Sequence, residues 1–293
     1  MPLRQIKRTL WSMPGVKERV LVAVSLALAL CAVAAPRIGQ DDRHVMVDQR
    51  TIAGVPYGMD VLSNLPFLFV GVAGLIATSS RRSGRTPFRD AWTRWPYRAL
   101  FAGVVLTTFG STWYHLAPST ARVVWDRLPM TIAFGGLLAA VIAERVSVRI
   151  ARALFLPVLL AGVGSVAYWY LTQRAGAGDL RAYALVQFGS LIIVLLILVL
   201  YPSREHGAGW LGGGLALYGV AKAFEMTDGA VYHALHVVSG HTLKHVTAAV
   251  AVGCVVAMLR ARLESAPEQV TPEVGELQDI EQMGGLVGIG VRD

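Results

Sequence analysis

Charged residues are scarce in this sequence. Only 16% of the 293 residues are Asp, Glu, Lys or Arg, whereas 54% are hydrophobic, and the mean hydropathy is +0.52. Soluble domains contain roughly a quarter of charged residues, and their apolar residues do not form long charge-free blocks. The composition therefore excludes an ordinary water-soluble globule and indicates an all-α polytopic membrane protein.

Cysteine is also scarce, and no clustered basic surface is present. Cys31 and Cys254 lie inside apolar stretches, so the sequence has neither a disulfide framework nor zinc-finger spacing. Lysine and arginine number 27 against 19 acidic residues, but they lie between apolar blocks instead of on one face. Membrane topology explains this distribution, and nucleic-acid binding is not predicted.

Eight apolar blocks have the length that a membrane helix needs. They cover residues 20–36, 60–80, 97–116, 122–143, 152–172, 182–201, 208–228 and 240–260. The first follows a basic leader and resembles a signal peptide, but its length and the poor cleavage site at Pro36 favour a retained helix. The expected organisation is a leader and extra helix (1–36), an outer loop (37–59), a helical core (60–262) and an acidic, disordered tail (263–293).

The basic loops predict the orientation of the chain in the membrane. Five basic residues precede the first block, five follow the second and two follow the fourth, whereas the connection between the seventh and eighth blocks has none. Both termini are therefore expected in the cytoplasm, although three arginines in the first outer loop are an exception. The bias towards Ala, Gly, Val and Arg suggests a bacterial inner membrane.

Ionisable residues inside spans are costly, so each is a candidate functional residue. The predicted topology brings the end of the third span, the start of the fourth, the end of the seventh and the start of the eighth to the outer face. Their polar residues are Ser111 and His115; Asp126; Lys222, Glu225 and Asp228; and His241 and His245. The spacing of four in His241 and His245 places both imidazoles on one helix face.

Three imidazoles from two helices with one open position match a catalytic zinc site. We predict that His115, His241 and His245 bind the metal, against the alternative that they are inert residues near the headgroups. His233 and His236 are the competitors for the place of His115. His44 and His206 are interpreted as solvated loop residues.

Other polar residues permit two interpretations. Asp126 is either a general base beside the metal or an ion-pair partner of Arg127 or Arg122. Glu225 and Asp228 either orient the imidazoles or neutralise Lys222, and the second is favoured. An N-cap of the second span explains Asp60, whereas the role of Asn64 stays open.

The ordered set of these motifs resembles the alkaline ceramidase family of the CREST superfamily of seven-helix membrane hydrolases and receptors. The matching positions are Ser63-Asn64, Gly110-Ser111 with His115, Asp126 followed by Leu128-Pro129-Met130, and His241 with His245. The resemblance covers residues 48–260. It implies a seven-helix core, to which the first span adds an eighth helix.

The resemblance also implies an activity. In that family three histidines hold zinc, and the reaction hydrolyses the amide of ceramide to a fatty acid and a sphingoid base. Carried over, His115, His241 and His245 become zinc ligands, while Ser111 stabilises the oxyanion and Asp126 transfers the proton to the leaving amine. The substrate is then a ceramide or another N-acyl lipid; the oligomeric state is not implied.

Two departures from the family matter. The acidic segment that binds calcium in the eukaryotic enzymes is not matched by residues 41–50, so calcium is not predicted. The aromatic pair between the last two histidines is replaced by Thr242, Leu243 and Lys244, and Lys244 would change the headgroup preference. The alternative function is a receptor or structural membrane protein with a non-catalytic metal site; a transporter is less favoured, because paired broken helices are not seen.

Overall fold

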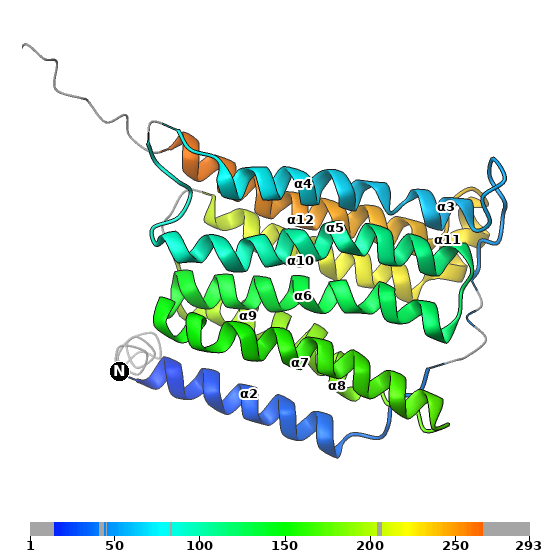
Figure 1. Cartoon of the computed structure of the whole chain (residues 1–293), viewed down its shortest axis with the longest axis horizontal. Helices are drawn as coiled ribbons and strands as arrows, with labels where there is room; N and C mark the ends of the chain where they lie inside the picture. Colours follow the sequence, from blue (N-terminus) through cyan, green and yellow to red (C-terminus); the bar gives the residue numbers. More distant parts are fainter. Residues whose placement is uncertain (1–14, 41–43, 45, 83, 204–206, 266–293) are drawn as a thin grey trace, which may run out of the picture.

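The computed structural model describes residues 15–40, 44, 46–82, 84–203 and 207–265. Within these ranges the secondary structure is helical apart from two isolated bridges, and the long helices lie side by side along one direction (Figure 1). The helices are α2 (Val16–Ala34), α3 (Gly58–Leu62), α4 (Leu65–Ser79), the 3-10 turn η1 (Ala91–Thr93), α5 (Arg94–Leu116), α6 (Thr120–Arg145), α7 (Val148–Arg174), α8 (Arg181–Ala184), the π-helical turn η2 (Leu185–Gly189), α9 (Ser190–Leu200), α10 (Ala208–Met226), α11 (Asp228–Leu235) and α12 (Gly240–Glu264).

Each of the eight predicted blocks contains helix in the structure. Five helical segments are long and apolar enough to cross a membrane: Gly58–Ser79, Thr120–Arg145, Val148–Arg174, Arg181–Leu200 and Gly240–Glu264. The described part of the chain is therefore all-α, and five of its helical segments are suited to cross a membrane. The full count of eight spans stays a prediction, because α2, α5 and α10 do not meet the same criterion.

Serine residues begin three of the long helices. Ser119, Ser147 and Ser239 each accept a hydrogen bond from a backbone N–H in the first turn of α6, α7 and α12, respectively. This is the usual way to satisfy the free donors of a helix N-terminus. These caps fix where the chain turns back after α5, α6 and α11.

Two spans are less regular than the sequence suggests. The second block divides at Ser63 and Asn64 into α3 and α4, and the sixth contains the π-helical turn η2. The interpretation of Asp60 as an N-cap is wrong: Asp60 lies within α3, and its carboxylate accepts a hydrogen bond from Thr242 of α12 at 2.9 Å. Both irregular segments lie beside the cluster of polar residues described below.

Close packing between helices forms the core. α5 packs against α4 and α6, and α12 packs against α4 and α10, around buried side chains such as Tyr97, Phe101 and Leu259. Large apolar side chains on the outside, including Leu30, Phe69, Leu171 and Val199, are mostly exposed. Exposed apolar side chains on long helices are the expected surface towards lipid.

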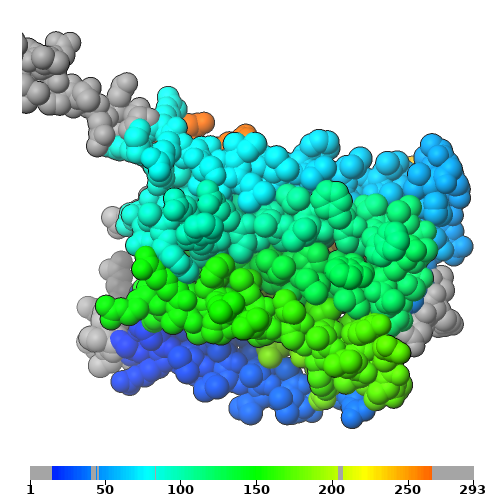
Figure 2. Space-filling model, viewed as in Figure 1, coloured from blue at the N-terminus to red at the C-terminus, as the bar shows by residue number. Residues whose placement is uncertain are grey.

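The first helix lies at the periphery of the bundle. α2 packs against α8, η2 and α9, and Figure 2 shows it at one edge of the face formed by α4, α5, α6 and α7. Arg181 fastens its end by donating to the carbonyl oxygens of Val33 and Ala35 at 2.8 and 2.7 Å. The leader (residues 1–14) and most of the predicted acidic tail (266–293) lie outside the described residues.

Candidate metal centre

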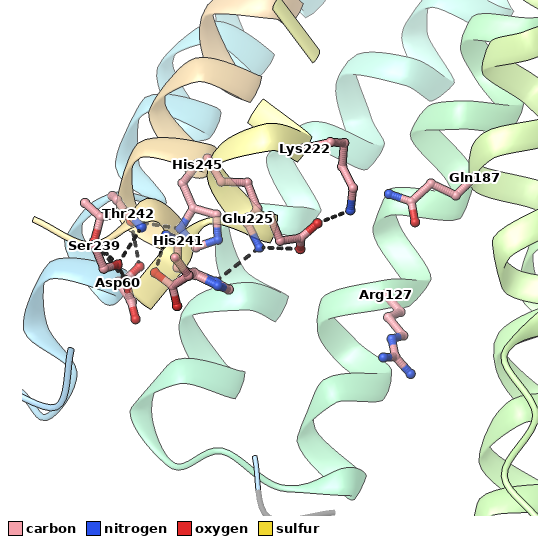
Figure 3. A network of polar contacts seen from close by, with 12 residues as sticks. Asp60, Arg127, Gln187, Lys222, Glu225, Ser239, His241, Thr242 and His245 are labelled. Carbon is pink, nitrogen blue, oxygen red and sulfur yellow. Dashed lines mark hydrogen bonds and ion pairs between the residues drawn. The ribbon is translucent and has the colours of Figure 1, made fainter. Parts of the chain in front are cut away.

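Three histidines converge where α5 ends and α12 begins. The candidate ligand atoms of His115, His241 and His245 all lie within 4.8 Å of one another, and the Nε2 atoms of His115 and His241 are 3.2 Å apart. Figure 3 shows His241 and His245 projecting from neighbouring turns of α12. The prediction that these three residues meet is confirmed, and they lie close enough to hold a metal ion.

Two glycines permit the approach of the helices that carry the cluster. A Cβ atom at Gly110 would overlap the carbonyl oxygen of Trp125, so α5 touches the backbone of α6 next to Ser111 and Asp126. A Cβ atom at Gly240 would overlap the carbonyl oxygen of Phe224, which brings the start of α12 against α10. Small residues at such crossings allow backbones to come close together.

Ser63 sets the tautomer of His245. The Ser63 hydroxyl donates to the carbonyl oxygen of Asp60 at 2.9 Å, and its oxygen lies 2.8 Å from Nδ1 of His245. Because the single hydroxyl proton is already used, Ser63 accepts a hydrogen bond from Nδ1–H of His245. The lone pair of that imidazole is then on Nε2, the form that binds a metal ion.

The donor set fits a metal ion. Two imidazole nitrogens bound at about 2.1 Å in tetrahedral geometry lie about 3.4 Å apart, and the Nε2 atoms of His115 and His241 are separated by 3.2 Å. The Nδ1 atom of His115 is buried and has no hydrogen-bond partner among the described residues. Three nitrogen ligands are typical of zinc sites that keep a position open, although the arrangement does not by itself identify the metal.

Ser111 and Asp126 line a cavity of about 390 Å³ together with His241 and His245. The Ser111 hydroxyl is buried and has no hydrogen-bond partner in the described part of the chain. In the same part, Asp126 forms no ion pair with Arg127 or Arg122, which stack on the rings of Trp169 and Trp113, respectively. The ion-pair alternative is therefore not seen among the described residues, and Asp126 lines the cavity.

Glu225 neutralises lysines, as the favoured interpretation expects. It forms ion pairs with Lys222 and with Lys244, the latter at 3.1 Å (Figure 3). Lys244 Nζ also lies 3.2 Å from Nε2 of His241. Asp228 has another role: its carboxylate accepts a hydrogen bond from the backbone N–H of His241 at 2.8 Å and so holds the start of α12.

The remaining histidines do not join the cluster. His233 lies on α11 and His236 follows it, and both are exposed. The interpretation of His44 as solvated is wrong, because the residue is buried and its ring lies within 3.1 Å of the Tyr114 hydroxyl and 3.0 Å of Thr120 Oγ1. His206 lies outside the described residues.

The loop before α3 is tied to the segment before α12. Arg50 donates to both carboxylate oxygens of the buried Asp48 and to the carbonyl oxygen of Val237 at 2.7 Å. The Arg50 guanidinium therefore holds the pKa of the Asp48 carboxyl below its usual range. This contact fastens two connections on the side of the bundle where the histidines lie.

An apolar pocket of about 120 Å³ adjoins the polar cavity. The two share five lining residues: Phe67, Thr107, Met130, Tyr218 and Ala248. The rest of the apolar pocket extends between α5, α6, α10 and α12 and is lined by residues such as Leu100, Leu137 and Val255. The histidine cluster is therefore reached from a space with one polar and one apolar arm.

Comparison of the sequence with models of known protein families gave no match, and comparison with curated proteins gave none either.

Proposed function

We propose that the protein is a zinc-dependent membrane amidase that hydrolyses the N-acyl bond of a ceramide-like lipid. In this proposal α2 adds an eighth span to a seven-helix core, both termini are cytoplasmic, and the histidine cluster faces the outer side of a bacterial inner membrane. The resemblance to alkaline ceramidases motivates the choice of reaction. The convergence of His115, His241 and His245 beside a cavity with an apolar arm is the observation that carries the proposal.

The shape of the space suits an amide with a long apolar chain. The apolar arm would hold the acyl chain, because its lining offers almost no polar atoms. The polar arm would hold the amine portion of the substrate. The scissile carbonyl carbon would then lie near the histidines, where the two arms join.

The reaction is an amide hydrolysis: a C–O bond forms from water, the C–N bond breaks, and the nitrogen takes up a proton. A metal ion on the three histidines would supply Lewis acidity for the carbonyl and for water. Asp126 would accept the proton of water and deliver it to the leaving amine, and the Ser111 hydroxyl would donate a hydrogen bond to the developing oxyanion. Ser63 would keep His245 in the tautomer that binds the metal.

Elemental analysis of the detergent-purified full chain tests the foundation of this proposal. We expect about one zinc per polypeptide in the wild type and a value near zero in His241→Ala, because loss of one of three protein ligands leaves too weak a site. Release of fatty acid from a ceramide is expected to vanish in the same variant. His233→Ala removes an exposed histidine from α11 and is the matched control, with unchanged zinc and activity.

The alternative, a receptor or structural protein with a non-catalytic metal, makes a different prediction. Such a protein would bind zinc in the wild type and lose it in His241→Ala but would cleave no N-acyl lipid. A folded wild type without metal, even after zinc is supplied, would contradict both functions. Zinc binding without hydrolysis of any N-acyl lipid would favour the receptor.

A further inference from the structure

The polar arm of the cavity carries more positive than negative side chains. Its lining includes three cations (Arg127, Lys222 and Lys244) and two carboxylates (Asp126 and Glu225). Glu225 is shared by the two lysines, so a single carboxylate serves both ammonium groups. A neutral amide lipid such as ceramide has no negative charge that would balance this excess of cations.

Of these three cations, Arg127 is the one that has no ion-pair partner among the described residues. Among the described residues it forms no ion pair; it donates to the side-chain oxygen of Gln40, and its guanidinium stacks over the ring of Trp169 at 4.1 Å. Its Nη1 atom is buried and has no hydrogen-bond partner in the part of the chain that the structure describes. A guanidinium with a buried Nη1 atom and no ion-pair partner among the described residues is costly, so this arrangement points to a ligand that supplies an oxyanion.

The position of Arg127 suits recognition of the amine portion of a substrate. Arg127 follows Asp126 on α6, and both residues line the same arm as the histidines. Trp169 stacks on the guanidinium and Gln40 accepts a hydrogen bond from Nη2, so Nη1 is the donor that an oxyanion would use. Arginine binds carboxylate and phosphate through two parallel hydrogen bonds, which lysine cannot do.

We propose that the preferred substrate is an N-acyl compound whose amine portion carries an oxyanion, a carboxylate or a phosphate, which binds to Arg127. This inference rests on the proposed amidase function and specifies its substrate class. The acyl chain lies in the apolar arm, the amide at the histidines and the anionic group at Arg127. An N-acyl amino acid or an anionic N-acyl lipid is then a better substrate than ceramide.

Binding to metal-free protein tests the anion site apart from catalysis. We compare N-palmitoylglycine with N-palmitoylethanolamine, which share the acyl chain and the amide but differ in charge, by calorimetry in mixed micelles. The wild type is expected to bind the carboxylate at least about tenfold more tightly, as is typical of charge-assisted hydrogen bonds. Arg127→Gln abolishes this difference, and Arg127→Lys, which keeps the charge, retains part of it.

Arg122→Gln is the matched control for these variants. Arg122 also lies on α6 and stacks on a tryptophan, but it does not line the cavity. Its substitution is expected to leave the ratio of the two affinities as in the wild type. Equal affinities of wild type for both ligands, or an equal loss for both in Arg127→Gln, would overturn the anion site.

Hydrolysis by zinc-loaded protein then identifies the anion and separates the two proposals. The substrates are N-palmitoylglycine, phosphorylated N-palmitoylethanolamine, N-palmitoylethanolamine and palmitoyl ceramide. The wild type is expected to show a kcat/KM at least about tenfold higher for one anionic amide than for the neutral ones, expressed mainly in KM. Preference for ceramide would contradict the anion site but would agree with the amidase function. Tight binding of the anionic ligands without cleavage of any substrate would agree with the anion site but would contradict the amidase function.

Discussion

The two ends of three helices use their polar residues in opposite ways. At one end α5, α6 and α12 contribute Tyr97, Glu144 and Arg262, respectively. Arg262 donates to both carboxylate oxygens of Glu144 at 2.5 and 3.0 Å, and the Tyr97 hydroxyl donates to Glu144 at 3.0 Å. At the other end the same helices contribute His115, Asp126 and the two histidines of α12. There the Ser111 hydroxyl and Nδ1 of His115 have no partner among the described residues.

This difference separates a structural use of buried polar groups from a functional one. Glu144 and Arg262 are nearly buried, with side-chain exposures of 11% and 7%, and Arg262 donates to both carboxylate oxygens of Glu144. Such a pair fixes the register of two helices but offers nothing to a ligand. An open hydrogen-bonding position on a buried group such as the Ser111 hydroxyl is costly, and it is understandable where a substrate completes it.

We call the end with the histidines the open end and the end with Glu144 and Arg262 the closed end. The largest effect of a single substitution on the rate of hydrolysis is expected at the open end. Asp126→Asn removes the proposed proton carrier while keeping the size of the side chain, and it should lower kcat by about 10²–10⁴-fold. The zinc content should stay near that of the wild type, because Asp126 is not a ligand. Undiminished hydrolysis by the zinc-loaded variant would show that another group transfers the proton.

A substitution at the closed end should change the stability of the fold instead of the rate of hydrolysis. Arg262→Met leaves the Glu144 carboxylate without its ion-pair partner and is expected to lower the free energy of unfolding by about 3 kcal/mol. Zinc per folded polypeptide should not change. Arg152→Met, which removes an exposed ion pair with Asp90, is the control and should cost less than about 1 kcal/mol; similar losses in both variants would contradict the distinction between the ends.

A third substitution examines how the open end is held in place. Ser63→Ala removes the acceptor of Nδ1–H of His245, and zinc affinity should fall about 10–100-fold, as measured by competition with a chelator. Ser165→Ala changes a buried serine of α7 that donates to the Gly162 carbonyl oxygen and should leave the affinity unchanged. Equal affinities in Ser63→Ala and the wild type would show that the tautomer of His245 is set elsewhere.

The smallest effect is expected in the loop before α3. Since Arg50 lowers the pKa of Asp48, this ion pair stabilises the fold above the unfolded carboxyl pKa of about 4, and the contribution disappears as the pH falls through the folded pKa. Asp48→Asn should therefore lower the unfolding temperature slightly at pH 6, and the difference from the wild type should shrink as the pH falls below about 4. The Arg50 side chain is 40% exposed, so added salt should shrink the difference.

The helices and the three candidate metal ligands could be predicted from sequence because both depend on local patterns. Apolar blocks fix the positions of the helices, and the spacing of four places His241 and His245 on one face. The alternation of helix direction then brings His115 to the same end. These steps need only chain order and periodicity.

The partners of the histidines depend on tertiary contacts that no local pattern encodes. Ser63 and His245 are 182 residues apart, and they meet because α3 and α4 pack beside α12. His44 is buried because the chain before α3 lies against Tyr114 and Thr120. The stacking of Arg127 on Trp169 likewise requires the approach of α6 and α7, and the sequence alone left Asp126 open as a possible partner of this arginine.

The close approach at Gly110 has a consequence for how the protein could change during evolution. No side chain fits there without separating α5 from α6, so the distance between Ser111 and Asp126 is set by the backbone and tolerates little variation. The walls that η2 contributes through Gln187 and Phe188 do not lie at such a backbone crossing, and these side chains can be exchanged one at a time. New substrate ranges are thus accessible by single substitutions on those walls, while the reacting groups stay in place.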